Sequence, residues 1–133
     1  MVASIGQQLK DMFETHSLAD FILASREYYD SNNDLKSEIL TGNDYKTNPA
    51  IQNFVASGSN ITLTFNTDGI QTFKSSPKSL WPIMCSINEL AFPYVENFLL
   101  LNTLWYCQKK PGSDAFLKPF VDEINKLYEE GVE

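Results

Sequence analysis

Asp68 is the side chain in this chain of 133 residues that is best placed to do metal chemistry. It follows Ile61–Asn66, where apolar and polar residues alternate as in a strand with two different faces. Carboxylates at strand ends suit magnesium, which prefers hard oxygen ligands held on a rigid frame. The dipeptide Asp68-Gly69 is also a common hairpin turn, in which Gly69 can take a positive φ, and spacing alone favours that interpretation.

Other reactive residue types lack partners nearby in the sequence. His16 stands alone and is interpreted as a surface or capping residue. Ser75-Ser76 has no histidine in reach by sequence, so nucleophilic catalysis is not predicted. Cys85 and Cys107 lie in separate apolar runs, which favours buried, reduced thiols in an intracellular protein over a disulfide or a zinc site.

The charge balance argues against a strong DNA-binding surface in this chain alone. Seventeen acidic and ten basic residues give a net charge of −7, and the only adjacent basic pair is Lys109-Lys110. Tracking phosphates needs clustered lysine and arginine, so we predict poor binding of duplex DNA. No apolar run reaches the roughly 20 residues that cross a bilayer, and the N-terminus does not resemble a signal peptide, so no membrane partner is expected.

Three strands must position Asp68 if it is functional. Ile61–Asn66 is the first, Trp81–Ile87 the second, and Phe98–Cys107, a nearly continuous apolar run, the third. The third strand is expected to be covered on both faces. Trp81 and Trp105 lie within these strands, so we interpret both as core residues.

Helices are predicted on both sides of the strands. Apolar residues recur at helical spacing before residue 24, with Ser17 as a capping residue. After the strands, Ser113 is the expected N-cap of a last helix that Gly131 ends. Pro119 should kink this helix, or the regular helix starts later than Asp114. The apolar stripe of this helix is expected at Leu117, Val121, Ile124 and Tyr128. The order predicts an α/β (α+β) fold, with residues 1–57 as a helical or irregular segment and residues 58–133 as the main domain.

Seven short segments follow one another in an order typical of one family. They are Asn66-Thr67-Asp68-Gly69, Phe73-Lys74-Ser75-Ser76, Ser79-Leu80-Trp81-Pro82-Ile83, Ile87-Asn88-Glu89-Leu90, Lys109-Lys110-Pro111, Phe116-Leu117-Lys118-Pro119-Phe120-Val121 and Leu127-Tyr128-Glu129-Glu130-Gly131-Val132. Over residues 58–132 the chain thus resembles CACTA-type (En/Spm-like) DNA transposases, in the N-terminal part of their DDE, ribonuclease-H-like catalytic domain. The resemblance implies a partial ribonuclease-H-like fold with a three-stranded sheet.

The resemblance also implies roles for particular residues. Asp68 would be the first of three acidic ligands for Mg²⁺ or Mn²⁺, which drive an in-line phosphoryl displacement in the intact family. Lys74 and Lys78 would then face DNA phosphates, although solvated loop lysines are the simpler interpretation. The family further implies a nuclear location, and DNA as a partner only within an intact transposase.

The chain departs from the family pattern in two informative places. Asn102-Thr103 replaces two small residues in the third strand, and bulkier groups are expected to crowd whatever packs there. The strand and helix that would carry the second and third carboxylates are expected to lie beyond Glu133. We therefore predict a fragment or relic that is inactive alone and does not hold the metal stably.

Two alternatives remain open from the sequence. The chain could be a non-catalytic, transposase-derived module that binds a protein through its acidic surface, or an unrelated α+β domain. The resemblance has one more implication: the first strand is central in ribonuclease-H-like sheets, so without a fourth strand residues 61–65 would form an open edge unless the N-terminal segment covers them, and we predict self-association through that edge.

Overall fold

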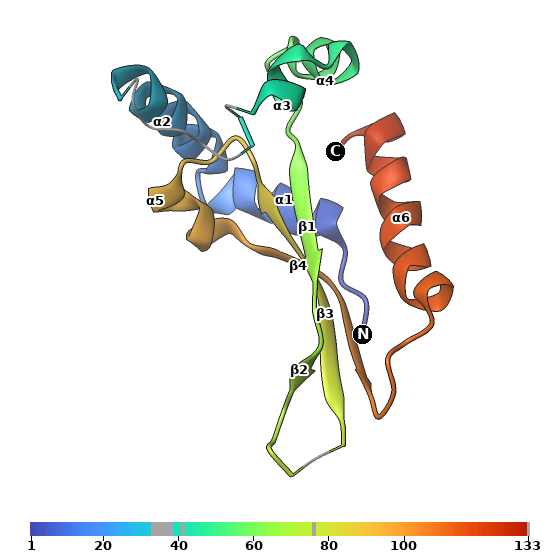
Figure 1. The fold of residues 1–133 in the computed structure, drawn as a ribbon. Coiled ribbons are helices and arrows are strands. Elements are labelled where there is room, and N and C mark those ends of the chain that lie inside the picture. Colours follow the sequence, from blue (N-terminus) through green and yellow to red (C-terminus); the bar gives the residue numbers. More distant parts are fainter. Residues whose placement is uncertain (33–38, 41, 76, 133) are drawn as a thin grey trace. The chain divides into compact units, whose positions relative to one another are not determined.

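The computed structural model describes residues 1–32, 39–40, 42–75 and 77–132. It is a mixed α and β fold, as predicted, with helices before the strands and a long helix after them (Figure 1). The elements are α1 (Ile5–Thr15), α2 (Leu18–Ser31), α3 (Asn43–Thr47), α4 (Pro49–Val55), β1 (Leu63–Thr67), β2 (Ile70–Gln71), β3 (Ser79–Ile87), α5 (Phe92–Val95), the 3₁₀ turn η1 (Glu96–Phe98), β4 (Leu100–Cys107) and α6 (Ser113–Glu130). Among the described residues, none of the helices combines the length and the apolar character needed to cross a membrane.

The chain forms two compact units, which are described separately. The sheet unit comprises Met1–His16, Phe65–Cys85 and Leu100–Glu133, and the helical unit comprises Ser17–Thr64 and Ser86–Leu99. Each unit draws on segments that are distant in the sequence. The predicted division between residues 57 and 58 stays a prediction.

Four strands form one sheet, with β3 between β4 on one side and both β1 and β2 on the other. The three predicted strands are present, with ends shifted by up to two residues, and β2 is an additional strand of two residues. β3 runs antiparallel to β4, with Trp81 opposite Trp105, and a register shift follows Ile83. The middle of the sheet is buried, because Ile83, Cys85 and Leu100 are each at most 1% exposed.

Only the first half of β4 is covered. Leu100, Asn102 and Thr103 are buried, whereas Trp105 is 38% and Tyr106 54% exposed. The prediction of a third strand covered on both faces is therefore wrong for its second half, as is the assignment of Trp105 to the core. The ring of Phe116 in α6 meets the Trp105 ring edge-on, with ring centres 6.4 Å apart, and leaves the rest of the indole open.

The N-terminal segment covers the outer edge of β4. The amino group of Met1 donates to the Leu104 carbonyl, and the Leu104 N–H donates to the Met1 carbonyl at 2.9 Å. The Gln8 side-chain amide donates to the Leu101 carbonyl at 2.8 Å and accepts from the Leu101 N–H at 3.1 Å. An amide side chain thus replaces a neighbouring strand at this position, so the backbone groups of β4 are not left unpaired.

Asn102 and Thr103 are accommodated by hydrogen bonds. The Asn102 amide donates to the Ala3 carbonyl at 3.0 Å and to a Glu123 carboxylate oxygen at 2.8 Å. Its carbonyl oxygen accepts from the Thr103 hydroxyl at 2.7 Å. Asn102 is fully buried, and these bonds satisfy its polar groups. Asn102 and Thr103 therefore fit inside the sheet unit, where a network of hydrogen bonds accommodates their larger side chains.

α6 lies along the sheet, and its N-cap differs from the prediction (Figure 1). Gly112 is its N-cap and Ser113 its first residue, so the predicted cap at Ser113 is wrong. Pro119 lies inside a helix that continues to Glu130. Gly131, with φ 78°, ends the helix as predicted, and its N–H donates to the Leu127 carbonyl.

The buried face of α6 is rotated from the predicted stripe. Phe116 and Phe120 are each 5% exposed, whereas Val121 is 47% and Tyr128 73% exposed. The Phe120 ring contacts the Phe65 ring of β1, with ring centres 4.9 Å apart. Two phenylalanines one turn apart therefore attach the helix to the sheet, because aromatic rings bury more apolar area than valine does.

The capping predictions for the first two helices are confirmed in position. His16 is the exposed C-cap of α1, and its N–H donates to the Met12 carbonyl. Ser17 is the N-cap of α2, but it has φ 53° and its side chain makes no capping hydrogen bond.

In the helical unit, a buried serine joins α2 to the segment before α5. The Ser25 hydroxyl donates to the Phe21 carbonyl at 2.7 Å and accepts from the Ala91 N–H at 2.8 Å. The Phe21 ring packs between the rings of Tyr94 and Phe98, with ring centres 5.3 and 5.1 Å away. These contacts hold α2 against the turn region that follows β3.

The two cysteines differ in environment, although both are free. Cys85 is 1% exposed, and Cys107 is half-buried, so the prediction of a buried thiol holds for Cys85 only. Burial raises the pKa of the Cys85 thiol to about 11, and the Glu123 carboxylate adds to the rise. This thiol is therefore protonated and unreactive near neutral pH.

We expect Cys85 to make the stability of the fold fall at high pH. Its folded pKa of about 11 lies above the ordinary value of 9.0, so the protonated thiol favours the fold fully below pH 9. That contribution is lost as the pH rises towards and through about 11, because only the unfolded thiol ionises freely. The check is urea unfolding at pH 7 and pH 10: the stability difference between wild type and Cys85→Ala should shrink at pH 10, and an unchanged difference would contradict the assignment.

β1 is the open edge of the sheet. Among the described residues, β1 pairs with β3 alone, and Phe65 is 51% exposed. In the part of the chain that the structure describes, the hydrogen bonds of Met1–Gln8 to the sheet go to β4, so we expect concentration-dependent self-association through the β1 edge by light scattering. Asn66→Lys, at an exposed position on β1, should reduce it, because a lysine on an edge strand discourages pairing. Asn125→Lys on the exposed side of α6 adds the same charge and should leave it unchanged; equal effects of both would count against the edge.

Candidate functional site

Asp68 and Gly69 lie within a long strand edge and not in a hairpin turn. Ile70 pairs with Leu80 in antiparallel register, and the Asn88 N–H donates to the Thr62 carbonyl in the same register. β1 and β2 therefore continue one another along β3, and Asp68-Gly69 joins them. The chain reverses only after Gln71, so the interpretation of Asp68-Gly69 as a hairpin turn is wrong.

A proline opposite Asp68 explains why the strand is interrupted there. In this register Asp68 faces Pro82, and Gly69 faces Trp81. Proline has no N–H and cannot donate to the facing strand. The backbone pairing therefore lapses between Thr67 and Ile70, and the aspartate is presented where the regular ladder is broken.

Gly69 is needed because the Trp81 ring lies against its backbone. A Cβ at this position would meet the ring atoms Cζ2 at 2.5 Å and Cε2 at 2.7 Å, closer than real Cβ atoms come. Gly69 has no positive φ, unlike Gly58 and Gly131, so the expected reason for a glycine here is wrong. Close approach of the indole, and not a turn conformation, requires it.

The Asp68 carboxylate is exposed to solvent. One of its oxygens accepts the Gly69 N–H at 2.7 Å, which fixes the carboxylate beside the main chain. Asp68 is exposed, whereas its neighbours Thr67 and Gly69 are partly buried. An open, oriented carboxylate of this kind can supply one oxygen ligand to a hydrated divalent cation.

Two buried polar atoms belong to residues near Asp68: Thr67 precedes it, and Trp81 lies against Gly69, which follows it. The Thr67 hydroxyl and the Trp81 indole N–H are buried and have no hydrogen-bond partner among the described residues. Unsatisfied buried groups are rare, and they occur more often at functional sites than elsewhere. The term Asp68 site is used below for Thr67, Asp68, Gly69, Trp81 and Pro82.

The described residues do not form a complete metal site. Nowhere in the described ranges do three or more His, Cys, Asp or Glu side chains gather closely enough to hold a metal ion. Asp68 supplies one hard ligand, and two catalytic Mg²⁺ ions need several. The Asp68 region can thus supply one ligand to a pair of metal ions, but it cannot hold the pair by itself.

The lysines that follow Asp68 lie at the far end of the sheet. Lys74 is exposed in the β2–β3 connection, and the Lys78 ammonium lies 5.3 Å from the centre of the Tyr106 ring. On the neighbouring loop, the Lys110 ammonium lies 5.5 Å from the centre of the Trp81 ring. Ser75 is exposed in the same connection, and Ser76 lies outside the described residues.

A carboxylate in the helical unit holds the start of β1. Both oxygens of Glu89 accept the Thr62 N–H at 2.9 Å, and one accepts the Thr62 hydroxyl at 2.8 Å. The Tyr45 hydroxyl also reaches Glu89, at 3.5 Å, and burial is the main cause that raises the pKa of Tyr45. Glu89 has filled its acceptor positions with protein donors, so its role is structural.

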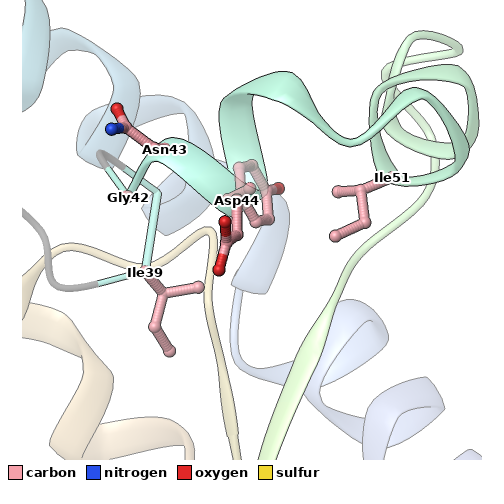
Figure 2. A pocket seen from close by; sticks show the side chains of 6 residues that line it. Ile39, Gly42, Asn43, Asp44 and Ile51 are labelled. Carbon is pink, nitrogen blue, oxygen red and sulfur yellow. The ribbon is translucent and has the colours of Figure 1, made fainter.

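The helical unit also contains a shallow hollow of about 390 Å³ beside α3 and α4 (Figure 2). Its lining is mainly apolar, with one carboxylate, and consists of Ile39, Gly42, Asn43, Asp44, Tyr45 and Ile51. Among the described residues that line it, none forms a pair of nucleophile and base.

Sequence reasoning found Asp68 but missed what surrounds it. The contact between Gly69 and Trp81 and the position of Pro82 depend on strand register, which the sequence does not give. The signal available in the sequence was Pro82 itself, a proline near the start of the second predicted strand.

Comparison with known proteins identifies the family. A family model described as transposase family tnp2 matches residues 40–133, which is more than half of the chain and includes the Asp68 site. No curated protein and no solved structure matches the chain. The chain therefore belongs to the transposase family tnp2.

Proposed function

We propose that this chain is part of a cut-and-paste DNA transposase of the CACTA (En/Spm-like) type. In this proposal its sheet is the beginning of a DDE, ribonuclease-H-like catalytic domain that acts in the nucleus. Asp68 supplies the first carboxylate ligand for Mg²⁺ or Mn²⁺. Family membership supports transposition as the process, and the Asp68 site supports the assignment of the ligand.

The observation that best supports the proposal is the position and exposure of Asp68 in the sheet. A turn aspartate would lie at a chain reversal, but Asp68 lies in the interruption between β1 and β2, which run along the same side of β3, and it is exposed and oriented by the Gly69 N–H. Two metal ions bound there would activate water and stabilise the leaving 3′ oxygen. With one carboxylate at the site among the described residues, this chain binds the metal weakly and does not cleave DNA alone.

The test is a titration of Mn²⁺ into ¹⁵N-labelled protein, read as broadening of backbone amide signals. We expect broadening centred on Thr67, Asp68 and Gly69 that disappears in Asp68→Asn. Glu129→Gln, at an exposed position on α6, removes the same charge and should leave the broadening at Asp68 unchanged. A well-dispersed spectrum without local broadening would overturn the assignment of Asp68 and favour a non-catalytic role.

A further inference from the structure

Four lysines that are dispersed in the sequence meet at one end of the sheet. Ser79 pairs with Cys107, so the residues just before β3 and just after β4 lie at the same level. Figure 1 shows the β2–β3 connection and the loop before α6 together at the lower end of the view. Lys74 and Lys78 belong to the first segment, and Lys109 and Lys110 to the second. We call these four lysines, with Phe73, Trp105 and Tyr106, the basic tip.

The basic tip has a charge opposite to that of the chain as a whole. Residues 69–82 and 105–113 contain these four lysines and no aspartate or glutamate, whereas the whole chain has a net charge of −7. Asp114, in the first turn of α6, is the carboxylate that follows directly in sequence. Segregated positive charge on an acidic protein marks a surface for a polyanion, because the local field attracts phosphates that the rest of the chain repels.

Exposed aromatic rings lie among these lysines. Phe73, next to Lys74, is 69% exposed, and Tyr106, whose ring lies under Lys78, is 54% exposed. Trp105 is 38% exposed on the same strand. Large apolar rings at a charged tip are costly in water unless they meet a partner, and unpaired bases stack on such rings. Duplex DNA hides its base faces, so the combination fits a single strand better than a double helix.

From charge complementarity and these exposed rings, we propose that the basic tip binds single-stranded DNA, with the lysines on phosphates and Phe73 and Tyr106 against bases. The choice of DNA over RNA rests on the proposed function. The basic tip shares no residue with the Asp68 site, but the Lys110 ammonium lies 5.5 Å from the centre of the Trp81 ring, so the two surfaces adjoin. Poor binding of duplex DNA, as the composition predicts, is compatible with this role.

The test is fluorescence anisotropy with a labelled oligothymidylate of about 15 nucleotides, a length within the usual range of site sizes, at low salt and with EDTA. If four phosphates are contacted, log K should fall with log[salt] with a slope of roughly −3. Lys109→Glu/Lys110→Glu should weaken binding about tenfold or more and bring the slope to roughly −1.5. The control Lys118→Glu/Lys126→Glu changes two exposed lysines of α6 by the same charge and should leave the slope unchanged.

Stacking has its own matched pair of variants. Phe73→Ala should weaken binding about tenfold, because a base stacked on an aromatic ring contributes 1–3 kcal/mol. Phe92→Ala changes an even more exposed ring, 77% exposed, which belongs to α5 of the helical unit, and should leave binding unchanged. Circular dichroism of each variant confirms that the fold is kept.

Each outcome has one meaning for the basic tip. No binding of the oligothymidylate at low salt, equal losses in the tip and control variants, or tighter binding of duplex DNA or of oligouridylate would overturn the proposal. The anisotropy experiment contains EDTA and therefore does not depend on metal binding. A negative result in it would not affect the interpretation of the Mn²⁺ titration at Asp68. Conversely, loss of local broadening at Asp68 would remove the proposed function without affecting the measured slope.

Discussion

Replacing Glu123 with alanine is expected to destabilise the sheet unit by about 2–3 kcal/mol, since hydrogen bonds to a charged group contribute roughly 1.5–3 kcal/mol each and the site is partly open to solvent. The Glu123 carboxylate accepts the Ser4 hydroxyl at 2.8 Å, the Gly6 N–H at 3.2 Å and the Asn102 amide at 2.8 Å. These donors come from the N-terminal segment and from β4. One side chain of α6 therefore joins three parts of the unit, and its loss leaves the fully buried Asn102 with one fewer acceptor.

The measurement is chemical denaturation followed by far-ultraviolet circular dichroism. Glu123→Gln keeps the size and one acceptor oxygen, so it should cost less than Glu123→Ala. Glu129→Ala lies on the same helix at an exposed position and should change stability by less than about 0.5 kcal/mol. If Glu123→Ala lowered the free energy of unfolding no more than Glu129→Ala does, the Glu123 hydrogen bonds would not contribute to stability.

Replacing Gly69 with alanine is expected to cost about 1–3 kcal/mol, because an added methyl group in a packed region forces its neighbours to move. The new Cβ would lie 2.5 Å from Cζ2 of the Trp81 ring, which must tilt or leave its position. The change should also alter Trp81 fluorescence, measured in a Trp105→Phe background so that a single indole reports. Because the same glycine adjoins Asp68, the variant should also reduce Mn²⁺ broadening at Asp68.

Two controls make the Gly69 prediction specific. A Cβ at Gly112 would meet nothing within 4 Å, so Gly112→Ala should cost less, limited to the preference for glycine over alanine at an N-cap. In a Trp81→Ala background, room is available, and Gly69→Ala should cost under about 0.5 kcal/mol, since the coupling between the two sites is lost. If Gly69→Ala destabilised the Trp81→Ala protein as much as the wild type, the backbone conformation, and not contact with the indole, would be the reason for a glycine at this position.

Local sequence patterns predicted where the helices and strands lie better than they predicted which of their faces are buried. The alternation in Ile61–Asn66 and the long apolar runs predicted the strands to within two residues. In α6, however, an apolar stripe through Val121 and Tyr128 was available alongside the one through Phe116 and Phe120. Both have helical spacing, and only packing against the sheet decided that the phenylalanines are buried, so periodicity could not choose between them.

The sequence by itself determined that the chain is a mixed α and β protein with a transposase-like order of motifs, and it identified Asp68 as the candidate ligand. Those conclusions depend on local pattern and residue type. Strand register is non-local, because it depends on which residues of distant segments face one another. Three arrangements therefore became known only from the tertiary structure. Pro82 lies opposite Asp68, and the Trp81 ring packs against Gly69. The segment with Lys74 and Lys78 lies at the same end of the sheet as Lys109 and Lys110.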